Sequence, residues 1–339
     1  MSTPAAEGGP TRVVQLPSGE RVLPPVPGSG SGLLGQPAPP AEHPPVQGPA
    51  VVVGSRPVSA YTELTLEAPD IADVARPGQF VAFAVGGPTS AMLLRRSIAI
   101  AGVGGGRFSV VVSARAAGST WLAGLRPGEE LDVVGPLGRP FPLPPEGTPV
   151  LLVGGGYGAA ALVGLGGLLR SRGHEVAAVV GAGDQARLCS VEELSAVAAP
   201  FVVTTDDGSA GRTGRVTGPV AELVGGAGAV YACGPMPMLA AVAKLATERR
   251  VPSWVAVEES MACGVGVCMT CVLPVVGADG RSRFARSCTD GPVFAGDRVR
   301  FADVGTLPPD LVGADAMQLV HTPAASPAHP TAPREGETP

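Results

Sequence analysis

The stretch "PVLLVGGGYGAAALVGL" (residues 149–165) contains an apolar run, a glycine-rich turn and an alanine- and leucine-rich run. A strand that leads through glycines into a helix can place a pyrophosphate at the helix N-terminus. We therefore predict cofactor contacts at Gly154, Gly155, Gly156 and Gly158. The chain holds 49 glycines, so this stretch alone is also compatible with a glycine-rich composition and no binding role.

A second stretch, "YACGPMPMLAAV" (residues 231–242), repeats the order of apolar strand, turn and helix. Its turn residues are Cys233, Gly234 and Pro235. In an open parallel sheet, ligands bind at the carboxyl ends of the strands, so both turns are expected to face one crevice. Apolar strands alternate with helical segments over residues 147–250, which predicts a parallel α/β domain.

Upstream, residues 49–146 contain short β-rich runs broken by glycine and proline, as expected of an antiparallel β-barrel. Within it, "LLRRSIAIAG" (93–102) offers an arginine that can pair with a phosphate. "AGSTWLAGLRPG" (117–128) offers hydroxyl and N–H groups at a predicted helix start. Both suit a flavin, which converts hydride chemistry into single electrons. The plain alternative is that Arg95 and Arg96 are a solvated pair.

Downstream, "EESMACGVGVCMTCVLP" (258–274) and "RSCTDGPVF" (286–294) hold four of the six cysteines. Their spacing matches the plant-type [2Fe–2S] pattern, in which a loop supplies three thiolates and a distant cysteine the fourth. Structural zinc sites usually pair two knuckles, and only one is present here, so zinc is the weaker alternative. Disulfides are disfavoured in the reducing cytosol. The predicted cluster ligands are Cys263, Cys268, Cys271 and Cys288, in a small module over residues 251–304.

Both ends of the chain, residues 1–48 and 305–339, are rich in proline, glycine and alanine and are predicted to be disordered tails. No apolar run is long enough to span a membrane, and no leader segment is visible, so a cytoplasmic protein is expected. A net charge of −5 and 4% aromatic residues argue against nucleic-acid binding.

No side chain is predicted to act in acid–base catalysis, because three of the four histidines fall in the tails. Asp206 and Asp207 are expected to shape a glycine-rich loop near the nicotinamide site. Cys189 is expected to be a buried thiol with no catalytic or metal-binding function.

In this order, the motifs resemble the family of electron-transfer subunits of NAD-dependent dihydroorotate dehydrogenase, within the ferredoxin-reductase superfamily. The resemblance covers about residues 50–304. It implies FAD in the barrel, a [2Fe–2S] cluster in the C-terminal module and NAD as co-substrate. It also implies a separate FMN-containing catalytic subunit, two copies of each in a heterotetramer, and a role in pyrimidine biosynthesis. Electrons would pass from that FMN through the cluster to FAD and then to NAD+.

The resemblance also carries residue expectations. The FAD site is expected at Arg96, Ser97, Ile98, Ala99, Val112, Ser113, Gly118 and Ser119. Two departures stand out: Ala99 lacks the hydroxyl that the family offers to the flavin, and Ala161 replaces a proline of the nicotinamide loop. A lost hydrogen bond is worth about 0.5–1.5 kcal/mol, whereas alanine suits a helix.

Two other functions stay open on the sequence alone. One is a ferredoxin-reductase-type flavin subunit that serves another dehydrogenase. The other is a non-catalytic regulatory module with zinc on the four cysteines. The choice between NAD and NADP is also open, because "GAGDQARL" (181–188) holds both an acid and an arginine where the ribose would be recognised. NAD is expected from the resemblance.

Overall fold

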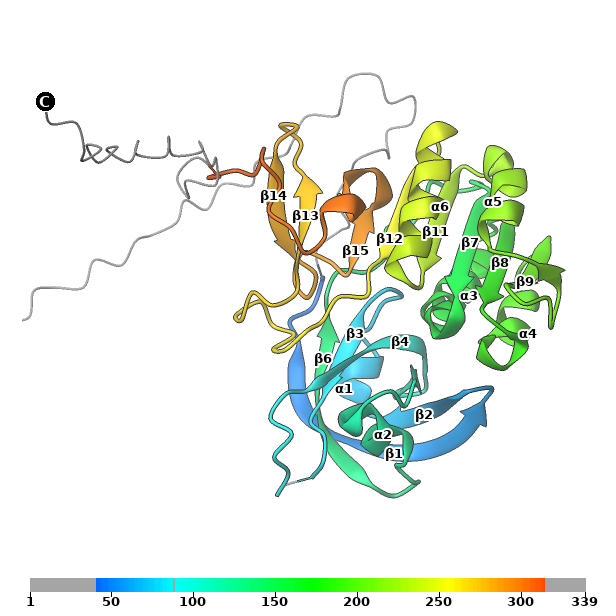
Figure 1. The fold of residues 1–339 in the computed structure, drawn as a ribbon. Helices are drawn as coiled ribbons and strands as arrows, with labels where there is room; N and C mark the ends of the chain where they lie inside the picture. Colours follow the sequence, from blue (N-terminus) through cyan, green and yellow to red (C-terminus); the bar gives the residue numbers. More distant parts are fainter. Residues whose placement is uncertain (1–40, 88, 315–339) are drawn as a thin grey trace, which may run out of the picture.

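The computed structural model describes residues 41–87 and 89–314. Figure 1 shows three parts: a barrel, an α/β domain and a small module with the cysteines. The predicted fold class is confirmed for these parts. Residues 1–40 and 315–339, most of the predicted tails, lie outside the described residues. Within the described ranges, no helix is long and apolar enough to cross a membrane.

The barrel closes in the order β1-β2-β5-β4-β3-β6, with β6 paired antiparallel to β1. Alternate residues of its strands point inward. On β5, Phe108 and Val110 are buried in the barrel core, whereas Val111 faces the α/β domain. The elements are β1 (Val46–Val58), β2 (Tyr61–Glu67), α1 (Pro69–Ala72), β3 (Phe80–Phe83), β4 (Arg96–Gly104), β5 (Arg107–Val112), α2 (Ala117–Ala123) and β6 (Glu130–Leu137).

Strand β1 begins inside the segment 1–48 that was expected to be a tail. Val46 pairs with Gly135, and Gly48 with Val133, on β6. This pairing with a distant strand gives hydrogen-bond partners to backbone N–H and C=O groups of β1. The composition of the segment contains no sign of this long-range pairing. The barrel therefore starts slightly earlier than the predicted boundary at residue 49.

The α/β domain has a seven-stranded sheet in the order β10-β9-β8-β7-β11-β12-β15. Its strands alternate their side chains between two helical layers: Leu152 packs with α3 and α4, and Leu151 and Val153 pack with α5 and α6. The strands are β7 (Val150–Gly155), β8 (Val176–Ala182), β9 (Phe201–Thr205), β10 (Arg212–Thr213), β11 (Ala229–Cys233), β12 (Ser253–Ala256) and β15 (Val293–Ala295). The helices are α3 (Val163–Ser171), α4 (Val191–Ser195), α5 (Thr217–Leu223) and α6 (Met236–Glu248), with short 3₁₀ turns η2 (Gln185–Arg187) and η3 (Val224–Gly226).

The helix predicted directly after the glycine turn begins differently. A 3₁₀ helix, η1 (Gly156–Leu162), precedes α3. A Cβ on Gly158 would lie 2.8 Å from the Cys233 carbonyl carbon, so two backbones pass here at contact distance. The segment at this contact is a 3₁₀ helix, which is wound more tightly than an α-helix.

Two strands of the predicted C-terminal module belong instead to the large sheet. β12 runs parallel to β11 and pairs Ser253 with Val230, and β15 pairs antiparallel with β12. The reason is that α6 leads back to the sheet as another βαβ crossover. The cysteine loop and the hairpin β13 (Val272–Val276)–β14 (Ser282–Arg286) are thus inserted between β12 and β15.

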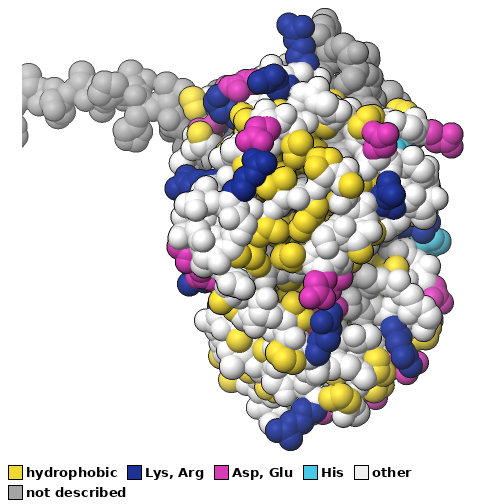
Figure 2. Space-filling model, turned by 90° about the vertical axis from the view of Figure 1, so that its right-hand side faces the viewer, with side chains coloured by type: hydrophobic (Ala, Val, Ile, Leu, Met, Phe, Trp, Pro, Cys, Tyr) yellow, Lys and Arg dark blue, Asp and Glu magenta, His cyan; other side chains and the backbone are white. Residues whose placement is uncertain are grey.

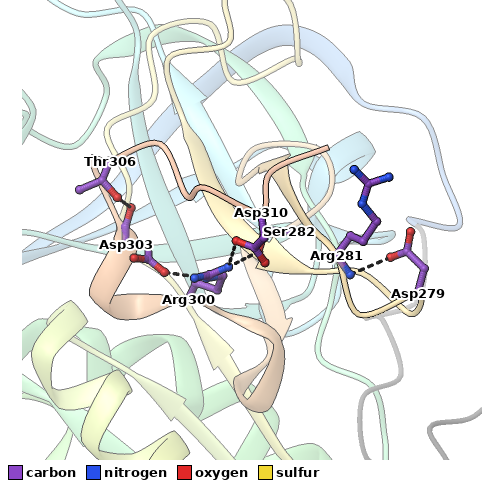
Figure 3. Close-up of polar contacts among 7 residues, drawn as sticks. All are labelled: Asp279, Arg281, Ser282, Arg300, Asp303, Thr306 and Asp310. Carbon is purple, nitrogen blue, oxygen red and sulfur yellow. Dashed lines mark hydrogen bonds and ion pairs between the residues drawn. The ribbon is translucent and has the colours of Figure 1, made fainter. Parts of the chain in front are cut away.

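The segment after residue 304, expected to be tail, continues on this module up to residue 314. Arg300 Nε donates to Asp303 Oδ2 at 2.6 Å and its guanidinium also bonds Ser282 and Asp310 (Figure 3). The Ser282 hydroxyl donates to Asp310 Oδ2 at 2.8 Å. These contacts tie the turn η5 (Phe301–Asp303) and the following residues to β14. In the preceding turn η4 (Gly296–Arg298), Arg298 Nη1 donates to the Gly277 carbonyl at 2.9 Å.

The opposite side of the molecule carries the free edge of the sheet. β10 pairs only with Thr204 and Thr205 of β9. Phe201, Val202 and Val203 therefore stay half-buried. Figure 2 looks onto this side and shows hydrophobic side chains gathered between charged ones. In Figure 1 this edge lies far from the cysteine module.

Candidate functional site

A cavity of about 380 Å³ lies where the barrel, the α/β domain and the segment before the cysteines meet. Its walls bring together residues that are far apart in the sequence. The barrel contributes Ser97, Ile98, Ala99, Ser113 and Ser119, the α/β domain contributes Gly158, Ala161 and Cys233, and the third wall is residues 256–261.

The two predicted nicotinamide turns meet at the carboxyl ends of adjacent strands, because β7 pairs parallel with β11. A Cβ on Gly234 would lie 2.9 Å from Gly155 Cα. Gly156 has a φ of +53° and Gly234 a φ of +154°, conformations that glycine adopts readily. The glycine loop and the Cys233–Pro235 turn therefore form one surface, as the sequence predicted, and Gly158 and Cys233 reach the cavity.

The predicted flavin strand forms the facing wall. Ser97, Ile98 and Ala99 lie on β4 and line the cavity. Ser97 contributes a hydroxyl group to this wall, whereas Ala99 contributes none. Val112 differs from expectation, because its side chain is fully buried in the barrel core. Of the two neighbouring predicted residues, Val112 and Ser113, only Ser113 lines the cavity.

Arg96 and α2 form the second predicted flavin element. A Cβ on Gly118 would lie 2.8 Å from Arg96 Cζ, so the guanidinium lies directly against this glycine. Arg96 Nη1 donates to the Leu94 carbonyl at 2.6 Å. The Ser119 hydroxyl accepts from the N–H groups of Arg115 and Ala116 at 3.0 and 3.1 Å. That hydroxyl caps its own helix, so a cofactor contact would have to replace one of these bonds.

Among the cavity residues that were not predicted, Arg115, Tyr157 and Glu258 form one connected group. The Tyr157 hydroxyl donates to Glu258 Oε2 at 3.1 Å, and the Arg115 guanidinium lies 5.0 Å from the centre of the Tyr157 ring. Burial raises the pKa of Glu258 above its ordinary value, although Tyr157 and Arg115 oppose that shift. Tyr157 lies within the glycine stretch at residues 154–158. An aromatic residue among glycines is the sequence signal that could have indicated a cavity-lining side chain here.

The cysteine loop makes a tight turn around the Cys263 thiol. Gly264 and Gly266 have φ values of +74° and +82°. The N–H groups of Val265 and Val267 both point at Cys263 Sγ, each at 3.4 Å. Such N–H···S bonds stabilise thiolate ligands and tune cluster potentials.

The four thiols form two pairs: Cys263 contacts Cys268, and Cys271 contacts Cys288. Across the described residues, no group of three or more His, Cys, Asp or Glu side chains is arranged to hold a single metal ion. A [2Fe–2S] cluster takes its four protein ligands from cysteine thiolates, so these four thiols are the groups that would hold the predicted cluster. Hydrogen bonds from Thr270, and then from Cys263, lower the pKa of Cys268 to about 6, which favours the thiolate that binds metal.

The cysteines also pack against the barrel. Cys271 and Cys288 are buried with Phe80 and Leu137, and Met261 packs on the same cluster. Phe80 and Met261 line the cavity as well. These two side chains therefore contact both the cavity and the cysteine site and lie between them.

Other residues singled out in the sequence have local roles. Cys189 is buried at the interface between the barrel and the α/β domain. Asp207 Oδ1 accepts from the Ser209 N–H at 2.9 Å and so shapes its turn. Asp184 and Arg187 form an ion pair at 3.5 Å.

Residues 258–300 match the family model described as the iron–sulfur cluster binding domain of dihydroorotate dehydrogenase B. The dihydroorotate dehydrogenase B (NAD(+)) electron transfer subunit of Bacillus caldolyticus is 38% identical over 241 residues, which cover 70% of this chain and 91% of that protein. The corresponding subunit of Shouchella clausii is 39% identical over 68% of this chain and 89% of its own. The chain belongs to this family.

A solved structure of an NADH-dependent reduced ferredoxin-NADP oxidoreductase, studied for flavin-based electron bifurcation, matches with a TM-score of 0.67 and 30% identity over 75% of this chain and 91% of its own. An Amycolatopsis cytochrome P450 reductase matches with a TM-score of 0.51 and 27% identity, over 61% of this chain and 67% of its own. These likenesses and the family model support FAD and a [2Fe–2S] cluster as cofactors. This member of the electron transfer subunit family is thus an oxidoreductase subunit of the flavin and electron-transfer type.

Proposed function

We propose that this chain is the subunit through which a dihydroorotate-oxidising catalytic subunit delivers electrons to NAD+ in pyrimidine biosynthesis. The observation that carries the proposal is the shared cavity. The flavin strand forms one wall, the nicotinamide turns form another, and the third wall continues within two residues into Cys263. A flavin bound there would exchange single electrons with a cluster and hydride with a nicotinamide.

The chain's own residues have distinct tasks in this proposal. Arg96 and Gly118 would hold the FAD diphosphate, and Ser97, Ile98, Ala99 and Ser113 would line the flavin. The nicotinamide would lie on Gly154–Gly158 and on the turn at Cys233, Gly234 and Pro235. Phe80 and Met261, which pack between the cavity and the cysteines, would limit water there and so lower the local dielectric around the site.

The partner is proposed to contain FMN and to assemble with this chain as a heterotetramer of two copies of each. We also propose a cytoplasmic location. In favour of it, Cys189 and Cys233, the two cysteines outside the proposed cluster, form no disulfide, as is usual in a reducing compartment.

The test is reconstitution with the catalytic subunit. The isolated chain should oxidise NADH with artificial acceptors but should not oxidise dihydroorotate, because we assign it a single flavin site. Mixing the two subunits should produce dihydroorotate-dependent reduction of NAD+. The Cys268→Ser variant should keep FAD and bind the partner, yet lose this coupling together with the cluster absorption.

The control is Cys189→Ser, which alters a free cysteine outside the proposed cluster. It should keep the cluster and the coupled activity. Dihydroorotate turnover by the isolated chain, or normal coupling by Cys268→Ser, would contradict the proposal. Stoichiometric zinc in protein purified without oxygen would instead favour the regulatory zinc module.

A second candidate function has support from the oxidoreductase match at 30% identity. In that case the chain would serve a ferredoxin-linked or other dehydrogenase partner. The same reconstitution separates the candidates, because NADH oxidation would then persist while the dihydroorotate-oxidising subunit neither binds the chain nor couples to it.

A further inference from the structure

Two buried hydroxyl groups lie on the residues beside the last of the four cysteines. In the part of the chain that the structure describes, four buried side-chain polar atoms have no hydrogen-bond partner: Thr204 Oγ1, Trp254 Nε1, Ser287 Oγ and Thr289 Oγ1. Two of the four belong to the residues directly before and after Cys288. A buried hydroxyl without a partner is costly, so such groups usually meet an acceptor. Their position next to a proposed ligand points to an acceptor at the cysteine site.

Of these two residues, Thr289 is the one that lies against the cysteine loop. A Cβ on Gly266 would lie 2.9 Å from Thr289 Cγ2 and 3.4 Å from Thr289 Oγ1. The Gly266 N–H itself donates to the Cys288 thiol. The Thr289 hydroxyl therefore lies beside a backbone group that already bonds a proposed cluster ligand.

Hydrogen bonds hold the turn that carries Thr289. The Thr289 N–H donates to the Arg286 carbonyl at 3.2 Å, and Asp290 Oδ2 accepts from the Arg286 N–H at 2.8 Å. Arg286 Nη1 donates to the Gly266 carbonyl at 3.2 Å, which joins the turn to the cysteine loop. A donor that is held in place in this way is preorganised for charge that develops beside it.

The donors around the loop fit a group that gains negative charge. Reduction adds one electron to a [2Fe–2S] cluster, and hydrogen bonds to its sulfur atoms help to set its potential. The charge of Arg286 is already offset, because its Nε pairs with Asp290 Oδ2 at 3.3 Å. A neutral hydroxyl in a buried place is thus a suitable donor here, since hydrogen bonds to charged acceptors are the strong ones.

We propose that the Thr289 hydroxyl donates a hydrogen bond to a sulfur atom of the [2Fe–2S] cluster and thereby raises the reduction potential of the cluster. The hydroxyl keeps its proton while one electron enters or leaves, so no covalent bond forms or breaks. The bond is stronger in the reduced state, which carries more negative charge. Within the proposed function, on which this inference rests, Thr289 makes the cluster a better acceptor for electrons from the catalytic subunit.

The test measures the reduction potential of the cluster in the full chain with its cofactors, by a redox titration followed by electron paramagnetic resonance of the reduced cluster. Thr289→Val replaces the hydroxyl with a methyl group of similar shape. At a fixed potential, the ratio of reduced to oxidised cluster should fall at least about threefold in this variant. That change corresponds to a potential about 30 mV lower, at about 59 mV per tenfold change for a one-electron couple.

Three further variants separate the hydroxyl from packing. Thr289→Ser keeps the hydroxyl and should keep the wild-type potential, whereas Thr289→Ala should lower the potential as Thr289→Val does. Thr204→Val is the matched control, because Thr204 Oγ1 is also buried without a partner but lies on β9, far from the cysteines (Figure 1). It should leave the potential unchanged. Loss of the cluster from both Thr289→Val and Thr289→Ala would indicate a structural role and overturn the proposal.

Resonance Raman spectra give a readout that does not depend on electron transfer to a partner. Transfer to D₂O should shift the iron–sulfur stretching bands more in the wild type than in Thr289→Val, because the variant lacks one exchangeable hydrogen bond to sulfur. An unchanged potential, or equal shifts in the two proteins, would overturn the proposal. A chain that holds the cluster but does not couple to the dihydroorotate-oxidising subunit would instead overturn the proposed function, and the effect of Thr289 on the potential would stand.

Discussion

Gly118 has no side chain, and this absence makes room for the Arg96 guanidinium at the proposed FAD site. The guanidinium lies against Gly118, at a place that a Cβ would occupy. Its Nη1 donates to the carbonyl groups of Leu94 and Arg95. A phosphate oxygen would be a stronger partner, because a hydrogen bond between charged groups is roughly twice as strong as one between neutral groups.

We predict that Arg96→Ala weakens FAD retention. Loss of a charge-assisted hydrogen bond costs about 1.5–3 kcal/mol, which corresponds to about a 10- to 150-fold higher Kd for FAD. The measurement is flavin content after dialysis, followed by titration with FAD. Arg107→Ala is the matched control, since Arg107 lies on the neighbouring strand in an exposed pair with Glu67 at 3.7 Å. Equal flavin binding by the two variants would place the FAD phosphate elsewhere.

At the scale of elements, the nicotinamide surface depends on how closely η1 approaches the end of β11. Gly158 lies against the Cys233 carbonyl, and Gly155 lies against Gly234. Both contacts are between backbones, so a flexible side chain cannot move away to make room. The parallel pairing of β7 with β11 brings the two turns together.

We predict that Gly158→Ala impairs NADH use while FAD and the cluster stay bound. The added methyl group would force η1 from the Cys233 turn, at a cost of about 1–3 kcal/mol for overpacking, and the KM for NADH should rise about 5- to 150-fold. Steady-state kinetics with ferricyanide would measure it.

The matched control is Gly167→Ala in α3, where a Cβ would meet nothing within 4 Å. There alanine should leave the KM unchanged and stabilise the helix by up to about 1 kcal/mol. A KM that rises equally in the two variants would show that the effect is not local to the turn.

For the whole molecule, the notable surface is the tip of the cysteine loop. Val265, Val267 and Met269 are 45%, 79% and 53% exposed beside the proposed cluster ligands. Apolar side chains that gather at a surface commonly mark a site of protein association. In Figure 1 this loop projects beside the barrel, away from the free edge of the sheet at β9. The catalytic partner is the occupant that the proposed function requires here.

We predict that Val267→Asp weakens association with the catalytic subunit at least about tenfold, because an unpaired charge is costly to bury in an interface. Its flavin and cluster absorption should remain normal. Binding can be followed by analytical ultracentrifugation of the mixed subunits. Val103→Asp is the control, since Val103 is 49% exposed on β4 near the turn into β5. Unchanged affinity in Val267→Asp would place the partner on another face.

Several parts of the site could be predicted from local sequence. Cys263, Cys268 and Cys271 lie on one short loop, so their spacing limits which metal centre they can bind. The glycines at 154–158 and the Cys233–Pro235 turn follow apolar strands, and the carboxyl ends of parallel strands share one edge. The boundaries were less predictable. β1 begins where it does because of its pairing with β6, and β12 and β15 belong to the large sheet because distant segments pair there.

Local sequence was enough to determine the kinds of domain and the ligand types, because periodicity, glycine turns and cysteine spacing depend on residues that are close along the chain. Tertiary packing alone fixed three further features: Val112 points into the barrel core, the Ser119 hydroxyl caps its own helix, and Tyr157 reaches Glu258 across 101 positions. Such contacts depend on how three packed parts lie against one another. Their energies arise from burial and from hydrogen bonds between distant segments, which no local pattern contains.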